Sequence, residues 1–314
     1  MKKLPQPIPY QGSKRGLARQ ILKFLPANVE RLVEPFAGSA ALSIATAYRN
    51  LAQRFWLNDV NQPLANLLRS IIEQPTEIAD QYQRLWHEQL GQERTFYDEV
   101  RNQFNRTHTP DRFLYLLARC VKASVRYNAN GEFNQAPDNR RKGRHPLSMR
   151  QEILAFSALL QGKTIVTCLD FRQTLEDINA QRDFVYLDPP YQGTSGTRDA
   201  RYSSGVTLCN LVTFLEDLNR RGVMFALSYD GIKGDKTYGK ELPVDLQLYQ
   251  ILIDAGRSTQ STLLGQNDIT YESLYLSPAL ATSVGIANDQ RLASAKFVPT
   301  LSATQQPQLQ FNFI

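Results

Sequence analysis

The sequence has little cysteine or histidine: three of each among 314 residues, scattered along the chain. That is too few for a disulfide framework or a zinc cluster, so no bound metal is expected. No apolar run approaches the roughly 20 residues that a membrane span requires. The two N-terminal lysines are not followed by the apolar stretch of a secretory signal. These absences predict a cytoplasmic protein that binds neither a metal nor a membrane.

Positive charge is concentrated in one segment. The formal net charge is +6, and residues 119–150 contain eight basic side chains against two acidic ones, so this segment alone carries the whole excess. Basic side chains beside Asn, Gln and Tyr are what a phosphate backbone attracts. The alternative is a solvated basic loop that binds nothing. Apolar residues make up 42% of the chain, which excludes a wholly disordered, collagen-like or coiled-coil protein.

Short β-branched or aromatic runs alternate with helical patterns along most of the chain. The runs predict buried strands at 31–36, 54–58, 164–168, 183–188 and 223–228, with helices at 38–50, 62–73, 149–161, 171–179 and 208–221. Such alternation favours an α/β fold, a parallel sheet covered on both faces.

The alternation fails between about 74 and 148. There the pattern indicates helices at 75–90, 93–105 and 111–126, followed by a polar loop. We therefore predict a catalytic domain formed by 1–73 and 149–278, interrupted by a small helical lobe at 74–148. A further strand is expected at 272–277. The tail, 279–314, is rich in Ala, Ser, Thr and Gln and is expected to be weakly structured.

Two features near the first strands suggest a nucleoside-containing ligand. In VEPFAGSAALS (33–43), Gly38 follows the first strand and opens a helix, where a ligand can approach free backbone N–H groups. Asp59 ends the second strand, where an acid can accept hydrogen bonds from ribose hydroxyls. A plain tight turn and a helix N-cap are the alternatives. The dinucleotide fingerprint GxGxxG is absent, which argues against a Rossmann oxidoreductase.

The sequence Asp188-Pro189-Pro190-Tyr191 ends a strongly apolar strand. The prolines fix the backbone and leave carbonyls without competing N–H donors, Asp188 supplies an anionic acceptor, and Tyr191 a flat stacking surface. Two acceptors on the amine of a nucleic-acid base would draw its nitrogen toward sp³ geometry and localise its lone pair. The alternative is a mere strand terminator. We predict catalysis by positioning and electrostatics, without a covalent intermediate.

These motifs, in this order, resemble the Dam-type (D12 class) DNA adenine N6-methyltransferases over about residues 8–278. PYQGSKR (9–15) is similar to their opening motif, CLDF (168–171) to the segment beside the cofactor adenine, and RYNANGEFN (126–134) to their recognition lobe. FALSYD (225–230) and ITYESLYLS (269–277) are similar to later strands. The resemblance implies a Rossmann-like methyltransferase sheet of seven strands, the last antiparallel, and S-adenosylmethionine as the methyl donor.

For this chain, the resemblance implies that the protein transfers a methyl group to N6 of adenine in double-stranded DNA, after the base has been flipped out of the helix. It implies catalytic roles for Asp188, Pro189, Pro190 and Tyr191. The implied cofactor-binding residues are Tyr10, Lys14, Glu34, Phe36, Gly38, Asp59, Asp170, Phe171 and Asp188. The expected DNA-binding residues are Lys122, Arg126, Asn128, Arg140, Arg141, Lys142 and Arg144, of which the last four are assigned to phosphates.

Several features differ from the family's usual pattern. Tyr10 replaces a tryptophan found in many members, Ser39-Ala40 stand where many have another glycine, and NRRKGR (139–144) is particular to this chain. The resemblance therefore does not predict the DNA target. The biological role also stays open: the protein could be the partner of a restriction endonuclease, an orphan regulator or a phage-borne enzyme. Rival activities are protein amide methylation, for which Asn usually precedes Pro-Pro-Tyr, and N4-cytosine methylation, for which Ser is commoner. A non-catalytic DNA-binding module would not need the intact DPPY sequence.

Overall fold

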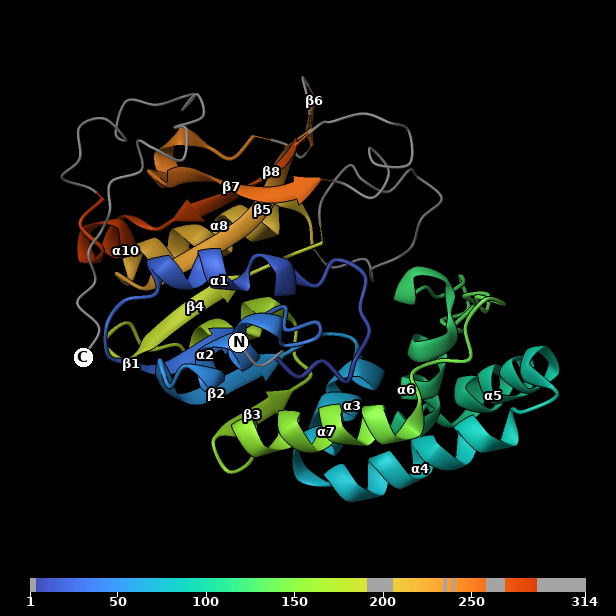
Figure 1. Ribbon diagram of the computed structural model, residues 1–314. Coiled ribbons are helices and arrows are strands. Elements are labelled where there is room, and N and C mark those ends of the chain that lie inside the picture. The colour runs from blue at the N-terminus through green and yellow to red at the C-terminus, as the bar shows by residue number, and fades with distance from the viewer. Residues whose placement is uncertain (1–3, 191–205, 234–235, 239–240, 258–268, 287–314) are drawn as a thin grey trace.

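The computed structural model describes residues 4–190, 206–233, 236–238, 241–257 and 269–286 (Figure 1). One sheet dominates, with strand order β3-β2-β1-β4-β5-β8-β7 and the short β6 paired to β5. The strands are β1 (Val29–Glu34), β2 (Ala52–Asn58), β3 (Thr164–Thr167), β4 (Asp183–Leu187), β5 (Met224–Lys233), β6 (Lys236–Tyr238), β7 (Tyr249–Arg257) and β8 (Ile269–Leu276).

The strands β3, β2, β1, β4 and β5 are mutually parallel, whereas β8 runs antiparallel to both of its neighbours, β5 and β7. The α/β class, the methyltransferase-type sheet and its antiparallel last strand are confirmed. All five side chains of β4 are buried, because this central strand is covered on both faces.

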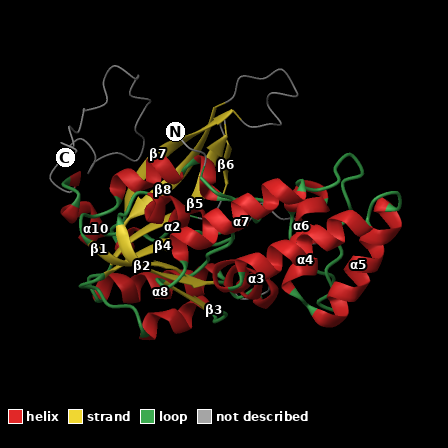
Figure 2. Cartoon of the chain, turned by 60° about the horizontal axis from the view of Figure 1, so that its bottom comes forward, coloured by secondary structure: helices red, strands yellow, loops and turns green. Residues whose placement is uncertain are grey.

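Successive residues of the central strands serve two separate cores. Leu32 of β1 joins the core under α1 (Ala18–Ile21), α2 (Ala41–Tyr48), α3 (Gln62–Glu73) and α7 (Pro146–Leu160). Val33 joins the opposite core, under α8 (Leu208–Arg220) and the 3₁₀ segment η4 (Phe171–Glu176). This alternation follows from the two-residue period of a strand, and Figure 2 shows helices on both sides of the sheet.

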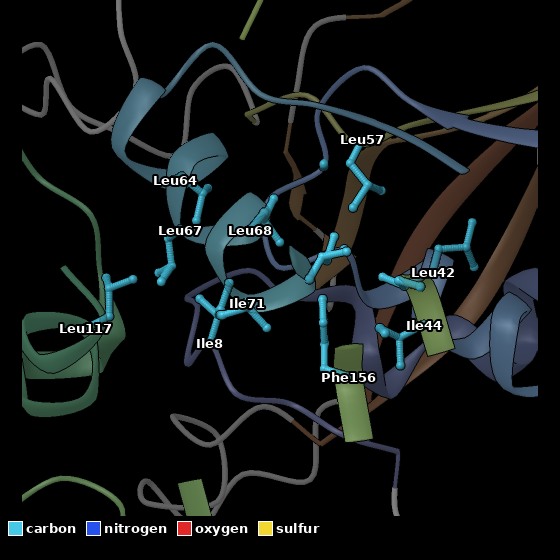
Figure 3. Close-up of a cluster of buried hydrophobic side chains, with 14 of the residues drawn as sticks. Ile8, Leu42, Ile44, Leu57, Leu64, Leu67, Leu68, Ile71, Leu117 and Phe156 are labelled. Carbon is cyan, nitrogen blue, oxygen red and sulfur yellow. The ribbon is translucent and has the colours of Figure 1, made fainter. Parts of the chain in front are cut away.

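The inserted helices extend beyond one side of the sheet (Figure 1). They are α4 (Pro75–Glu88), α5 (Glu93–Thr107) and α6 (Pro110–Arg119). Their buried side chains belong to the same core as α3 and α7. In Figure 3, leucines of α3 share one cluster with Leu117 of α6 and Phe156 of α7. A continuous apolar core fixes the lobe to the sheet domain, although the lobe boundaries at 74 and 148 remain a prediction.

Within the described part of the chain, proline marks the start of five helices. Helices α3, α4, α6, α7 and α10 (Pro278–Ser283) each have proline in the first turn, where a missing N–H costs no hydrogen bond. The prediction that the tail is weakly structured is wrong at its beginning, because residues 278–283 form α10. Ser277 caps this helix by accepting a hydrogen bond from the Leu280 N–H. The rest of that tail, from residue 287, lies outside the described residues.

Other elements differ from the predictions. Strand β3 is an exposed edge rather than a buried strand, with Ile165 60% exposed. Helix α6 ends at Arg119, not at 126, since Cys120 is extended and Lys122 has φ 59°. Residues 171–176 form a 3₁₀ segment, and β7 was not predicted. Among the described residues, no helix is long and apolar enough to cross a membrane.

Candidate active site

A cavity of about 1250 Å³ opens where β1, β2 and β4 end. Carboxyl ends of parallel strands are the usual ligand-binding edge of an α/β sheet. The cavity is lined by all nine residues predicted to bind a cofactor and by Pro189 and Pro190. Tyr191 and the loop 192–205 lie outside the described residues. The structure thus brings the N-terminal motif, the glycine turn, Asp59, CLDF and Asp188 to one place.

The turn after β1 is held by Asp59. Its Oδ2 accepts a hydrogen bond from the Gly38 N–H (3.0 Å), and its Oδ1 accepts one from the Asn61 N–H (2.9 Å). Burial raises the pKa of the Asp59 carboxyl. The alternative role of this acid as an N-cap falls instead to Asn61, whose side chain accepts from Leu64 N–H.

The same turn packs closely against the N-terminal motif. Gly38 has φ +52°, and a Cβ placed on it would lie 3.3 Å from Cε1 of Tyr10. Ala40 also has positive φ, so α2 begins only at Ala41. The hydroxyls of Ser13 and Ser39 are 2.9 Å apart. Glycine is needed here for both its backbone conformation and the close approach of Tyr10.

A buried acid and two aromatic rings border this turn. Glu34 accepts hydrogen bonds from the N–H and hydroxyl of Ser43, and its burial raises its pKa to about 7. The rings of Phe36 and Phe171 are 5.0 Å apart between centroids. Asp170 caps η4, and its hydrogen bonds with Arg172 hold its pKa low. The cavity therefore combines acidic side chains with flat apolar surface.

Asp188 is paired with Lys14 at the end of β4. Nζ of Lys14 lies 3.2 Å from Oδ1 of Asp188 and 3.3 Å from Oε2 of Glu272, and Lys14 itself is only 7% exposed. Burial raises the pKa of Asp188 to about 6, with Lys14 lowering it and Glu272 raising it. Sequence reasoning missed Glu272; the only signal was a carboxylate inside the otherwise strand-like ESLYLS.

Comparison with known proteins places this arrangement in a family. A sequence profile of the D12 class N6 adenine-specific DNA methyltransferases matches residues 10–257. The chain belongs to that family. The matched residues include Lys14, Gly38, Asp59 and Asp188, which line the cavity just described.

Individual proteins with similar sequences are also DNA methylases by name. The DNA N-6-adenine-methyltransferase of Escherichia phage P1 is 31% identical over 71% of this chain and 29% of its own length. The retron Ec67 DNA adenine methylase of Escherichia coli is 34% identical over 60% of this chain and 64% of its own. The modification methylase StsI of Streptococcus sanguinis is 28% identical over 72% of this chain and 35% of its own length. The matches thus span less than two thirds of these relatives.

Asn58 joins three segments next to the cavity, and sequence reasoning missed it. Its Nδ2 donates to the carbonyls of Pro35 (3.0 Å) and Leu169 (2.9 Å). Its Oδ1 accepts from the N–H of Leu169 (2.9 Å) and the hydroxyl of Thr167 (2.7 Å). This buried amide therefore links the turn after β1 to the CLDF segment after β3.

The loop formed by residues 126–134 lines one side of the cavity. Asn128, predicted to bind DNA, lines the cavity, but its Oδ1 also accepts from the N–H groups of Asn130 and Glu132. Tyr127 donates a hydrogen bond to Asn61 Oδ1 (3.2 Å), next to Asp59. Asn128 thus shapes its own loop, and Tyr127 joins that loop to the start of α3.

The remaining predicted DNA-binding residues lie away from the cavity lining. Arg140 and Arg141 share Asp138, and Lys142 pairs with Glu93 at 2.8 Å; these three bases are 83%, 62% and 60% exposed. Lys122 is exposed and Arg126 partly buried. Arg144 instead binds the carbonyl of Gln6 and Glu152, so it ties the lobe to the N-terminal segment.

The basic loop, residues 139–144, is anchored through its backbone. Tyr82 donates to the carbonyl of Arg144 (2.7 Å), and Gln89 Nε2 donates to that of Lys142 (2.8 Å). Arg119, which the sequence counts among the positive charges, is fully buried and hydrogen-bonds Gln89 and Tyr115. Its charge faces the lobe interior, so Arg119 adds nothing to the exposed positive charge of the loop.

Gly143→Ala is expected to destabilise the fold by more than the roughly 1–2 kcal/mol that left-handed backbone strain alone costs, measured by urea unfolding. Gly143 has φ +83°, and an added Cβ would lie 3.0 Å from the Tyr82 hydroxyl and 3.4 Å from Arg119 Cδ. Gly162→Ala is the matched control, since it has φ +76° with no atom within 4 Å. Equal losses in both variants would show that backbone strain alone, without steric crowding, accounts for the effect.

Proposed function

We propose that this chain transfers a methyl group from S-adenosylmethionine to N6 of adenine in double-stranded DNA. The observation that carries the proposal is Asp188-Pro189-Pro190 at the end of β4, in a cavity shared with the glycine turn and Asp59. Membership of the D12 class supports the reaction type. The exposed basic loop supports DNA as the substrate, because it supplies the phosphate contacts that duplex binding requires.

The lining residues fit S-adenosylmethionine. Asp59 would accept hydrogen bonds from its ribose hydroxyls, while Phe36 and Phe171 would flank its adenine. The carboxyls of Glu34, Asp59 and Asp188 outnumber Lys14, so the cavity favours a cationic ligand. Tyr10 and Asp170 also line the cavity. When bound, the cofactor supplies an electrophilic methyl group on its sulfonium.

Asp188 and Pro189 would activate the target amine. The Asp188 carboxylate would accept one N6–H and the Pro189 carbonyl the other, while Tyr191 would stack on the flipped base. Because the pKa of Asp188 is about 6, its carboxylate is ionised at neutral pH and is a stronger acceptor than an ordinary aspartate. Adenine N6 is inaccessible inside the base stack, so the base would be flipped into the cavity.

The function is tested by methyl transfer from labelled cofactor to duplex DNA, RNA and a mixed protein sample, followed by nucleoside analysis. N6-methyladenine from duplex DNA is expected. Label in N4-methylcytosine, in RNA or in protein would contradict the proposal, and binding without any transfer would identify a non-catalytic DNA-binding module. Methylation-aware sequencing of cells that express the chain would then read out the DNA target.

Asp59→Ala is expected to weaken S-adenosylmethionine binding about tenfold to a hundredfold, measured by calorimetry. The variant loses charge-assisted hydrogen bonds to the cofactor and releases the Gly38 and Asn61 N–H groups. Asp59→Asn is the matched control for shape, and it should bind more tightly than the alanine variant. Wild-type affinity in folded Asp59→Ala would contradict the assigned role.

Replacing Arg140, Arg141 and Lys142 together by alanine is expected to weaken binding to every duplex sequence. The salt dependence of log K should flatten by about 0.9 for each DNA phosphate that the variant no longer neutralises. The control triple variant changes Arg49, Arg54 and Lys163, which are exposed near the amino ends of β2 and β3. Fluorescence anisotropy across a salt series measures the affinity and the salt dependence of both triple variants. Equal slopes in the two variants would exclude the basic loop as the site of phosphate contacts.

A further inference from the structure

Lys14 lies in the wall between two cavities. The larger holds Asp188, and a second cavity of about 480 Å³ lies between the N-terminal segment and the strands β7 and β8. Ser13 and Lys14 line both cavities, whereas Asp188 lines only the first and Glu272 only the second. One nearly buried cation therefore separates two carboxylates, each of which faces its own cavity.

Glu272 is placed there by the antiparallel strand. In β8 it pairs in register with Gly231 of β5 and Ile253 of β7, next to the irregularity of β5 between Ser228 and Gly231. From this position its Oε1 and Oε2 lie 3.5 and 3.3 Å from Lys14 Nζ. The distances to the two carboxylates are almost equal, so Lys14 is shared between them.

We propose that Glu272 is a positioning residue that, by sharing Lys14, keeps Asp188 a strong hydrogen-bond acceptor. A lysine paired with Asp188 alone would hold much of the carboxylate's charge and weaken its attraction for the N6–H. Glu272 offsets that pairing, and Glu34, whose pKa is raised to about 7, is a further acid near Asp188. The side chains of Tyr10 and Tyr186 line the same cavity. The inference rests on the proposed function for its catalytic meaning, but its electrostatic part is measurable without it.

The direct test is titration of the Asp188 carboxyl by ¹³C NMR in the cofactor-free protein with labelled aspartate. Asp188→Asn assigns the resonance. The wild-type midpoint is expected near pH 6, and Glu272→Gln should lower it by roughly one pH unit. Glu272→Asp keeps the charge and should stay close to wild type. Asp254→Asn, which removes an exposed acid from the same second cavity, is the matched control and should not move it. An unchanged midpoint in folded Glu272→Gln would overturn the proposal.

Lys14→Met tests whether the effect passes through Lys14. Without the cation the Asp188 midpoint should rise, and the shift caused by Glu272→Gln should be smaller than in the Lys14 background. An equal shift in both backgrounds would overturn the sharing of Lys14. If Glu272→Gln folds poorly on its own, Lys14→Met alone still tests the pairing, because an Asp188 midpoint that does not rise in that variant would overturn it.

Activity gives a second readout. In Glu272→Gln the acid limb of kcat/KM for methyl transfer should move to lower pH together with the NMR midpoint, and the plateau rate should fall. A variant that loses activity at all pH values, without movement of the limb, would have a structural defect and overturn the proposal. Absence of methylation by the wild-type protein would instead contradict the proposed function, while the titration shift would still stand.

Discussion

Asp188→Ala is expected to slow methyl transfer to DNA by about 10²–10³-fold, the usual loss for one preorganised hydrogen-bonding group. The fold should persist for two reasons. Lys14 keeps Glu272 as a partner at 3.3 Å, so no buried cation is stranded. The pKa of the Asp188 carboxyl is raised from 3.8 to about 6, so its contribution to the stability of the folded state falls as pH rises between those values. At neutral pH the ionised carboxyl no longer contributes this stability, and its removal therefore loses none.

The comparison with Asp188→Asn isolates charge from geometry. An amide oxygen can still accept one hydrogen bond, so the asparagine variant should retain more activity than alanine. Single-turnover transfer at saturating cofactor and DNA measures the chemical step, and anisotropy measures DNA affinity in parallel. Transfer by Asp188→Ala at the wild-type single-turnover rate would show that N6 is activated by another group. A loss confined to DNA affinity would point to a binding role alone.

Asn58→Ala is expected to have the largest effect on stability, about 3–5 kcal/mol. The four hydrogen bonds of this fully buried amide would be removed, and two carbonyls, one N–H and the Thr167 hydroxyl would lose this partner. Since the amide joins Pro35 to Leu169, cofactor affinity should fall as well. Urea unfolding and calorimetry measure the two losses.

Two further variants sharpen this expectation. Asn58→Asp keeps the shape and the acceptor but loses both donor bonds, so its stability should lie near or below that of alanine because a charge is also buried. Asn102→Ala, on the exposed face of α5, is the control for asparagine removal and should change stability by less than about 0.5 kcal/mol. A similarly small loss in Asn58→Ala would mean that water replaces the amide.

Much of the fold could be predicted because the information is local. The apolar runs that became β1, β2, β4 and β5 each lie within a few residues, and the α/β class follows from their alternation with helices. The edge position of β3 could not be predicted, because its residues resemble those of a buried strand. Strand β7 was missed because its side chains, such as Tyr249, Gln250 and Asp254, mix apolar and polar types without strict alternation.

The residues around the site also fall into two groups, those that the local sequence predicts and those that only distant contacts define. Gly38, Asp59 and Asp188 lie where a strand meets a turn, so their own neighbourhood in the sequence singles them out. Asn58 reaches partners 23 and 111 residues away, Glu272 reaches Lys14 across 258 residues, and Arg119 resembles a surface base until the lobe folds around it.

The sequence by itself determined the α/β class, the family and the strand-end motifs. The tertiary structure alone decided which charges are buried, which are shared and which face outward. Arg119 and Arg144 are bound inside or between segments, whereas Arg140, Arg141 and Lys142 remain exposed. The physical reason is that the energy of a charge depends on its burial and on its neighbours in space, and folding brings together side chains that are far apart in the chain.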